Sequence, residues 1–328
     1  MQTLLLGPDD VDANTPLAAV IDAVEGAFGA YARGDVVMPA KSYVDLPQYN
    51  GDFRSMPAYV ATNEWDAAAV KWVNVHADNP EKYDLPTVLG TIIYSDPANA
   101  FPLSLMDGTH VTRKRTGAAA AVATDYLAVD DARSMGLVGA GVQSYTQLEA
   151  ISHVRDIEEV VVADVDEDAV QAFVDHFSDR FDVRAGSIEE AAHCDVLSTV
   201  TPVEEPLVHS VGEHTHVNAI GADAAGKHEI SDDILLDATL VIDDYDQCTH
   251  SGEINVPWSA GVLSDADLHA ELGEIVAGEK EGRTADDGVT VFDSTGLAIQ
   301  DVATAHVAYE RARENGAGTD FTLVGTDV

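Results

Sequence analysis

Near both ends of the chain, apolar residues recur every three or four positions, which is the spacing of amphipathic helices. In the first of these segments, residues 15–33, Thr15 is the predicted N-cap, Pro16 lies in the first turn, and Gly34 marks the stop. The last segment, residues 297–314, carries a second apolar face. We expect the first helix to cover a sheet and the last helix to return to the N-terminal domain.

Between the two terminal helices the pattern first changes to an alternation of apolar and polar residues, which is typical of strands. The predicted strands are residues 41–46, 53–59, 69–75 and 87–94, with a turn at Asn50-Gly51 joining the first two. Such adjacent strands predict an antiparallel or mixed sheet. After a turn at Asp107-Gly108, an Ala-rich segment from about Arg113 to Leu127 predicts a long helix that leads into a second domain.

The second half of the chain alternates between short apolar strands and helices. The strands are expected near residues 135–138, 159–163, 195–200, 216–220, 239–243 and 289–293. This alternation predicts an α/β fold with a Rossmann-type doubly wound parallel sheet, preceded by an α+β domain. A length of 328 residues is sufficient for two domains with separate cores.

The first strand of the second half ends in a glycine-rich turn, residues 137–144, with the sequence Leu-Val-Gly-Ala-Gly-Val-Gln-Ser. Gly139 would allow a tight turn and Gly141 a close approach of the backbone to a pyrophosphate. Ser144 stands where a third Gly or Ala is usual, so the turn taken alone could also be an ordinary strand-to-helix connection. However, Asp164 ends the next strand a little over ~20 residues later, where an acid binds ribose hydroxyls and repels a 2′-phosphate. The sequence therefore favours NAD over NADP.

The composition indicates a folded protein with an acidic surface. Asp and Glu number 58 against 17 Lys and Arg, giving a formal net charge of −41, while hydrophobic residues make up 46%. Such a balance is similar to that of proteins from organisms with molar intracellular salt, where screening over about 3 Å suppresses self-repulsion. It makes nucleic acids and anionic membranes poor partners. Two cysteines and no signal peptide or membrane-length apolar run predict a cytoplasmic protein without a disulfide framework.

The few lysines and arginines of this acidic chain are its candidate functional residues. They are Lys41 and Arg54 on the predicted hairpin, Lys71 in an apolar row with Val73 and Val75, and the group Arg113-Lys114-Arg115 at the predicted helix start, where the helix N-terminus could assist anion binding. Each could pair with a nearby carboxylate as a structural ion pair. Alternatively, several could converge on a substrate carboxylate, which Arg binds in a bidentate manner and Lys as a point charge.

Several motifs together resemble the ornithine cyclodeaminase and mu-crystallin family over nearly the whole chain. They are Met56-Pro57-Ala58-Tyr59, Lys71, the run from Leu105 to Ala118, the turn at Gly139, Ala219-Ile220-Gly221-Ala222-Asp223, and the run from Ser294 to Asp301. The resemblance implies a homodimer built through a substrate-binding and dimerisation domain, residues 1–115 and 297–328. It also implies an NAD(H)- or NADP(H)-binding Rossmann domain, residues 116–296, with the active site in the cleft between the two domains.

Residue roles also come from this resemblance. It implies that Lys41, Lys71 and Arg115 bind the substrate carboxylate, and that Lys71 and Asp223 are catalytic, with Asp223 as the acid/base beside Lys227 and Glu229. The implied cofactor-binding residues are Gly139, Gly141, Val142, Gln143, Asp164, Thr116 and Thr201. A carboxylate near the reacting carbon could take a proton from an amine and then activate water against the imine.

One departure from the family pattern bears on the substrate. Cyclodeaminases of this family carry a Glu that holds the side-chain ammonium of ornithine two residues before the Met-Pro pair, where this chain has Arg54. The chain therefore resembles the archaeal alanine dehydrogenase branch, for which we expect reversible NAD-dependent oxidative deamination of L-alanine, with Arg54 also binding substrate. The alternatives are an ornithine cyclodeaminase, a cyclic imino acid (ketimine) reductase, and a mu-crystallin-like protein that binds a nucleotide and a small ligand without turnover.

Three histidines, His209, His214 and His216, lie close together in the sequence, but no cysteine or second pair completes a recognisable metal site. We therefore expect no metal. Cys194 stands at the start of a predicted buried strand, where it is expected to be a small core residue rather than a nucleophile.

Overall fold

The computed structural model describes residues 1–222 and 224–325. The chain forms two compact units, one made of Met1–Arg115 and Leu297–Val328 and the other of Thr116–Gly296. The predicted α/β class is confirmed, since the second unit contains an all-parallel sheet and the first a mixed sheet. Among the described residues, no helix combines the length and the apolar character needed to cross a membrane.

The sheet of the first unit is mixed, as the alternating pattern predicted. Its strands run in the order β16-β1-β7-β6-β5-β4-β2, with β3 paired to β4, and neighbouring strands are antiparallel except for the parallel pair β1 and β7. The strands are β1 (Thr3–Leu6), β2 (Val36–Val37), β3 (Ser42–Leu46), β4 (Gly51–Ala61), β5 (Asp66–His76), β6 (Val88–Ser95), β7 (Pro102–Asp107) and β16 (Thr319–Phe321). The sequence pattern missed β1, β2, β7 and β16, of which β2 and β16 are only two or three residues long.

The helices of the first unit are α1 (Pro8–Asn14), α2 (Leu17–Ala32), α3 (Asn79–Tyr83) and α12 (Ala298–Asn315), and a short 3-10 turn spans Pro47–Tyr49. The expectation that Thr15 caps α2 was wrong. The Thr15 hydroxyl donates 2.7 Å to the carbonyl of Val11, so it closes the end of α1, a helix that the sequence pattern missed. Pro16 takes the N-cap position of α2 without a side-chain bond.

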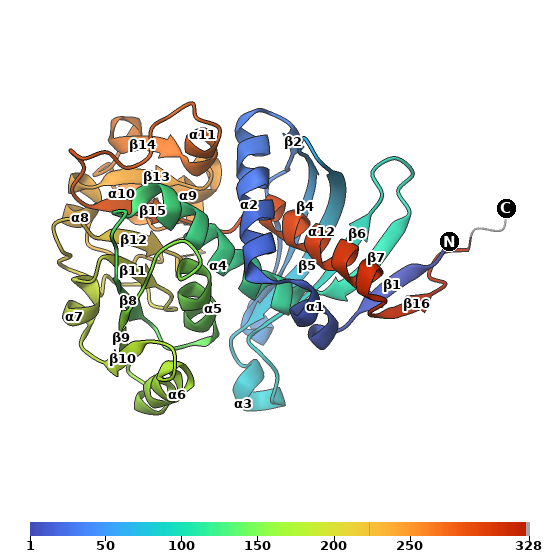
Figure 1. Cartoon of the computed structure of the whole chain (residues 1–328), viewed down its shortest axis with the longest axis horizontal. Coiled ribbons are helices and arrows are strands. Elements are labelled where there is room, and N and C mark those ends of the chain that lie inside the picture. The colour runs from blue at the N-terminus through green and yellow to red at the C-terminus, as the bar shows by residue number, and fades with distance from the viewer. Residues whose placement is uncertain (223, 326–328) are drawn as a thin grey trace. The chain divides into compact units, whose positions relative to one another are not determined.

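Helix α12 lies across the sheet of the first unit, against β4, β5 and β6, and α2 packs beside it (Figure 1). The C-terminal helix therefore belongs to the N-terminal unit. The first eight residues of α12 are all buried, including the polar residues Gln300, Asp301 and Thr304. A helix segment that is covered on every side is normally apolar. Because the polar side chains here cannot bond to water, they require partners within the protein.

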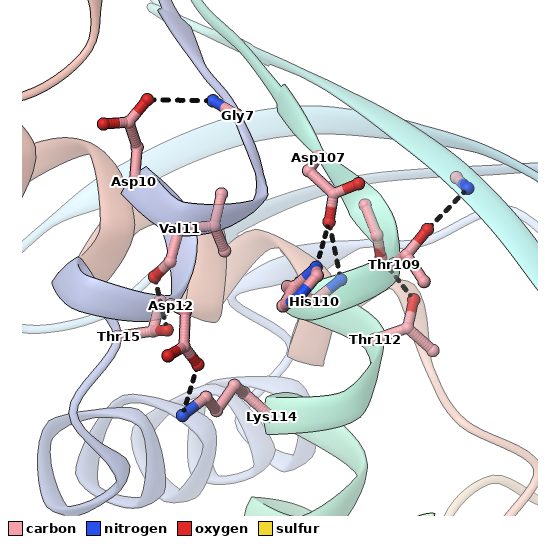
Figure 2. A network of polar contacts seen from close by, with 12 residues as sticks. Gly7, Asp10, Val11, Asp12, Thr15, Asp107, Thr109, His110, Thr112 and Lys114 are labelled. Carbon is pink, nitrogen blue, oxygen red and sulfur yellow. Dashed lines mark hydrogen bonds and ion pairs between the residues drawn. The ribbon is translucent and has the colours of Figure 1, made fainter. Parts of the chain in front are cut away.

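Helix α4 (Gly108–Leu127) begins five residues earlier than its apolar pattern indicated. Figure 2 shows the reason: Asp107 Oδ1 accepts hydrogen bonds from the backbone N–H of His110 at 2.7 Å and from its Nδ1 at 2.8 Å, which caps the first turn. Thr109 Oγ1 accepts from the backbone N–H of Gly90, and this bond fixes the start of α4 against β6. The predicted placement of Arg113-Lys114-Arg115 at the helix start was consequently wrong, because this group lies in the second turn of α4.

The second unit is a doubly wound parallel sheet in the order β10-β9-β8-β11-β12-β15-β13-β14. Its strands are β8 (Ser134–Val138), β9 (Glu159–Ala163), β10 (Asp182–Ala185), β11 (Val196–Thr199), β12 (His216–Ala219), β13 (Thr239–Ile242), β14 (Leu268–Glu271) and β15 (Thr290–Asp293). All six predicted strands are present, and β10 and β14 were missed. The chain order reverses between β8 and β11, the switch point at whose carboxyl edge doubly wound sheets bind ligands.

Short helices connect these strands. They are α5 (Val142–Ile151), α6 (Glu167–Phe177), α7 (Ile188–Ala192), α8 (Asp232–Asp237), α9 (Tyr245–Ser251), α10 (Asn255–Ser259) and α11 (Leu272–Val276), with a 3-10 turn at Asp265–Asp267. The Ala-rich part of α4, residues 118–123, is buried, and α4 approaches α5 closely at Gly117. At Gly117 a Cβ would lie only 2.5 Å from the carbonyl oxygen of Thr146, so this contact requires glycine.

Candidate active site

In the first unit, Lys71 is a cation buried in the core. It lies in the middle of β5, and its Nζ is 2.8 Å from Asp301 Oδ1 and 2.7 Å from Asp301 Oδ2 on α12. Both side chains are about as buried as the apolar core, at 1% and 2% exposed. Val73 in the predicted apolar row is buried and Val75 partly buried, and the partner that the buried lysine needs is Asp301.

Helix α4 brings a second cation to the same carboxylate. Arg115 Nε lies 3.3 Å from Asp301 Oδ1, and Arg115 Nη1 donates 3.0 Å to Gln300 Oε1. Thr112, one turn earlier on the same face of α4, is 3.4 Å from Lys71 Nζ. The spacing between Asp107 and Arg115 in the sequence thus has a physical basis, since the cap fixes the helix start and the later residues face Lys71.

Burial and neighbouring cations control the charge of Lys71. Its pKa is lowered to about 7, chiefly because the ammonium is removed from water, and Arg115 and Lys41 lower it further, while Asp301 opposes the shift. The effect of Lys41 on this pKa indicates that the two lysines are electrostatically coupled. Lys41, Lys71 and Arg115 therefore act on one region of the first unit, which we call the cation cluster.

Arg54 is in a different electrostatic situation. On β4, its Nε and Nη2 bond the carboxylate of Asp52 at 3.0–3.2 Å, and its guanidinium lies 5.5 Å from the ring centre of Tyr43. The side chain is 12% exposed. Arg54 therefore forms a structural ion pair, one of the two roles that the sequence left open for the cations, with Asp52 as its partner.

In the second unit, the glycine-rich turn connects β8 to α5. Gly139 has φ +107°, a value that favours glycine, and its backbone N–H donates 2.9 Å to the carbonyl of Ala163 at the end of β9. Asp164 directly follows: its Oδ2 accepts from the backbone N–H of Ala140 at 2.7 Å and its Oδ1 from that of Asp166 at 3.0 Å. These bonds hold an exposed carboxylate beside the turn.

The N-terminus of α5 has the features of a phosphate-binding site. Gly141 is the N-cap without any side-chain bond, and apart from its own turn no atom of the described residues lies within 4 Å of the position that a Cβ would occupy there. Val142 is 52% exposed beside it, and Gln143 follows in the first turn of α5. Ser144 is buried and donates its hydroxyl to the carbonyl of Gly141, so this substitution for a third glycine is accommodated inside the helix. The arrangement leaves room for the pyrophosphate of a dinucleotide against the helix amides.

Thr201, after β11, is held by a buried acid. Glu229 Oε1 accepts from the Thr201 backbone N–H at 2.9 Å and from its hydroxyl at 2.6 Å, and burial raises the pKa of Glu229. Glu253 Oε1 in turn accepts from the backbone N–H groups of Glu229 and Ile230. Through these bonds Glu229 and Glu253 fix the loops at the carboxyl ends of β11 and β12. Asp223, the predicted acid/base, lies outside the described residues.

Thr116 and the histidines complete the predicted set. Thr116 is buried, and its carbonyl accepts from Gln147 Nε2 at 3.3 Å.

His216 is buried between Thr290 and Asn218, and burial lowers its pKa to about 3, so it is a neutral core residue. No group of three or more His, Cys, Asp or Glu side chains in residues 1–222 and 224–325 is arranged to hold a metal ion. Cys194 is buried in the apolar core of the second unit.

Three residues of this site, Asp301, Gln300 and Thr112, had no role predicted from the sequence. Asp301 and Gln300 belong to the run Ser294–Asp301, and Thr112 to the run Leu105–Ala118, so the motifs contained them. The signal that could have identified them is polarity within a buried segment, because Gln300 and Asp301 follow apolar residues at the start of a helix without solvent exposure.

The parallel sheet, the glycine turn and the acid after β9 are those of dinucleotide-binding proteins, and the second unit belongs to that class. Comparison with protein families gives the particular group. The chain belongs to the ornithine cyclodeaminase/mu-crystallin family, whose model matches residues 1–316.

Individual relatives cover almost the whole chain. The alanine dehydrogenase of Archaeoglobus fulgidus is 46% identical over 322 residues, which are 97% of this chain and 98% of that protein. The solved structure of an archaeal alanine dehydrogenase dimer with bound NAD superposes with a TM-score of 0.94 at 45% identity, covering 99% of this chain and 100% of that one. The Delta(1)-pyrroline-2-carboxylate reductase of Thermococcus litoralis, solved with NADH and L-proline, has a TM-score of 0.92 at 37% identity and covers 97% and 99%.

Proposed function

We propose that this protein is an NAD-dependent L-alanine dehydrogenase, which converts L-alanine reversibly to pyruvate and ammonia. The observation that carries the proposal is the pair of buried cations Lys71 and Arg115, which share the single carboxylate of Asp301, with Lys41 acting on Lys71 electrostatically. The surplus of positive charge suits a carboxylate anion. The 46% identity to an alanine dehydrogenase over nearly the full length supports the same assignment.

The residues of the second unit fit NAD. The open space at Gly141 and the N-terminus of α5 suit a pyrophosphate, and the Asp164 carboxylate suits the two ribose hydroxyls but not a 2′-phosphate. We assign Gly139, Gly141, Val142, Gln143 and Asp164 to this site, with Thr116 and Thr201 as further contacts. NAD bound here would supply the acceptor for a hydride from the substrate Cα, and NADH the donor in the reverse direction.

The protein's own groups perform binding and proton transfer. Lys71, Arg115 and Lys41 bind the substrate carboxylate and so orient the Cα hydrogen. Asp223 takes a proton from the substrate amine before the imine forms and passes it to solvent. It then takes a proton from the water that attacks the imine carbon and returns it to the nitrogen, which leaves as ammonia. Glu229 supports this chemistry indirectly, because its bonds to Thr201 hold the loop that follows β11.

Arg54 argues for a small neutral side chain. It stands where the cyclodeaminases of the family carry a Glu, and it is paired with Asp52, so it cannot hold the side-chain ammonium of ornithine as that Glu does. Alanine has no side-chain ammonium, so Arg54 favours alanine and disfavours the ornithine cyclodeaminase reaction.

A second candidate is a cyclic imino acid reductase. The cation cluster would bind the carboxylate of a pyrroline or piperideine equally well, and the similar Thermococcus litoralis reductase was solved with L-proline. The non-enzymatic alternative, a mu-crystallin-like binding protein, predicts cofactor binding without turnover.

The outer face of the sheet in the first unit supports a homodimer. Lys71 faces α12, so its neighbour Trp72 faces the opposite side of the sheet, where it is 47% exposed and stacks on Phe53 at 5.1 Å. Val44 and Ile93 are exposed too, at 49% and 40%. We propose that a second copy of the chain covers this apolar face. Light scattering tests it: Trp72→Glu should give monomers, and an unchanged dimer would refute this placement.

We also propose a cytoplasmic location and adaptation to high salt, based on the charge of −41.

Turnover in molar KCl distinguishes the candidates. With NAD and L-alanine the protein should produce NADH, measured as an increase in absorbance at the NADH maximum. With NADH, pyruvate and ammonia the same absorbance should fall. Proline and ammonia from L-ornithine without net NADH would instead identify a cyclodeaminase. Consumption of NADH by pyrroline-2-carboxylate, but not by pyruvate with ammonia, would identify the imino acid reductase.

A further inference from the structure

Asp301 contacts two of the three cations in the cluster. Its Oδ1 and Oδ2 are 2.8 and 2.7 Å from Lys71 Nζ, and its Oδ1 is 3.3 Å from Arg115 Nε. It lies in the first turn of α12 and is 2% exposed. A buried carboxylate is costly unless it is paired, and this one is shared by cations from β5 and α4.

We propose that Asp301 is the positioning residue of the carboxylate-binding site, which holds the Lys71 ammonium and the Arg115 guanidinium at a fixed spacing for the substrate. This inference rests on the proposed function. Two cations that share one anion are pulled together against their mutual repulsion, and Gln300 fixes the other end of the guanidinium at 3.0 Å. Asp301 Oδ1 and Thr112 Oγ1 take two of the three donors of the Lys71 ammonium, and Gln300 Oε1 takes one of the five of the Arg115 guanidinium, so in these described contacts both side chains keep donors for a substrate carboxylate.

The same carboxylate also affects the protonation of Lys71. The groups that act on Lys71 are Asp301 from α12, Arg115 and Thr112 from α4, and Lys41. Asp301 is the anion among them, and it raises the pKa that burial and the two cations lower. Removing its charge should therefore make Lys71 lose its proton at lower pH, and with the proton its attraction for a carboxylate.

The test compares Asp301→Asn with the control variant Asp12→Asn. Both substitutions remove a carboxylate that pairs with a cation of α4, but Asp12 lies outside the cation cluster. Asp12 is bonded to Lys114 at 3.0 Å in an exposed position (Figure 2). In molar KCl, Asp301→Asn should raise the KM for pyruvate about tenfold or more, while NADH binding stays as in wild type. The alkaline limb of the pH profile of kcat/KM for pyruvate should move down by about one unit. Asp12→Asn should change none of these quantities.

An unchanged KM and an unchanged alkaline limb in folded Asp301→Asn would overturn the proposal. If that variant does not fold, Asp301→Glu replaces it: the charge is kept but displaced by one methylene, so KM should rise while the limb stays near its wild-type pH. A wild-type KM in Asp301→Glu would equally overturn the proposal.

A failure of the proposed function can be recognised separately. If the wild-type protein turns over pyrroline-2-carboxylate but not pyruvate, the same comparison is made with that carboxylate. If it turns over neither, the side-chain resonance of Lys71 is titrated by NMR in the wild-type protein and in Asp301→Asn. The chain has only six lysines, so this resonance can be assigned. Asp301→Asn should then lower the Lys71 pKa by about one unit or more, and an equal pKa would overturn the role of Asp301.

Discussion

Replacing Lys71 by methionine tests the cation cluster most directly. Methionine is similar in length, so it fills the buried volume of β5 while removing the charge. In the folded protein Asp301 would lose its contacts of 2.7 and 2.8 Å but keep Arg115 at 3.3 Å. Removing one partner of a buried ion pair costs about 3–5 kcal/mol, and the remaining Arg115 places the expected loss near the lower limit. For a unit of this size, about 3 kcal/mol lowers Tm by about 6–12 °C.

The effect on substrate binding follows from the loss of one charged donor. A hydrogen bond to a charged group contributes about 1.5–3 kcal/mol, so the KM for pyruvate should rise about 10- to 150-fold. The NADH affinity should be unchanged, because the proposed cofactor residues lie in the second unit. Steady-state kinetics in molar KCl and NADH fluorescence titration measure the two quantities.

The pH dependence gives a second readout of the same residue. The Lys71 charge is present below its pKa of about 7 and lost above it, so the wild-type KM for pyruvate should rise as pH increases through this value. In Lys71→Met this dependence should be absent. Lys114→Met is the control, since Lys114 pairs with the exposed Asp12 and such surface pairs contribute about 0–1 kcal/mol. If folded Lys71→Met kept the wild-type KM, the cluster would not be the substrate site.

Four further variants or conditions test other parts of the argument. Asp164→Ser should lower kcat/KM for NAD and raise it for NADP, each by about tenfold, because the carboxylate that favours ribose hydroxyls is lost; an unchanged ratio would contradict the assignment of Asp164. Gly221→Ala should destabilise the second unit by about 1–3 kcal/mol in thermal melts, since its Cβ would lie 2.1 Å from Glu229 Oε2, whereas Gly26→Ala on α2, with nothing within 4 Å, should not. Arg54→Glu should introduce turnover of L-ornithine, detected as proline, and no gain would show that Arg54 does not determine the substrate. Tm should rise with KCl concentration up to molar values, because the net charge of −41 repels itself in dilute buffer, and a Tm independent of salt would argue against adaptation to salt.

The accuracy of the sequence predictions depended on how local each signal was. The strands of the second unit were found because buried parallel strands are short, uniform apolar runs, and residues 159–163 were predicted at their observed bounds. The start of α4 was misplaced because its first turn is polar and is stabilised by Asp107 and by the contact of Thr109 with β6. Thr15 was misassigned because a threonine between two helices can serve either one.

The sequence by itself determined the Rossmann-type unit, the glycine turn with Asp164, and the family, because these are encoded in residues that are close together or at fixed spacing. It also singled out Lys71 as a cation in an apolar row. The tertiary structure alone decided which anion pairs with Lys71, since Asp301 is 230 residues away and reaches it only because α12 packs on the sheet of the first unit. It likewise decided that Arg54 is neutralised by Asp52 while Arg115 joins the cation cluster. Charge compensation depends on distance in space, and a sequence pattern carries distance only along the chain.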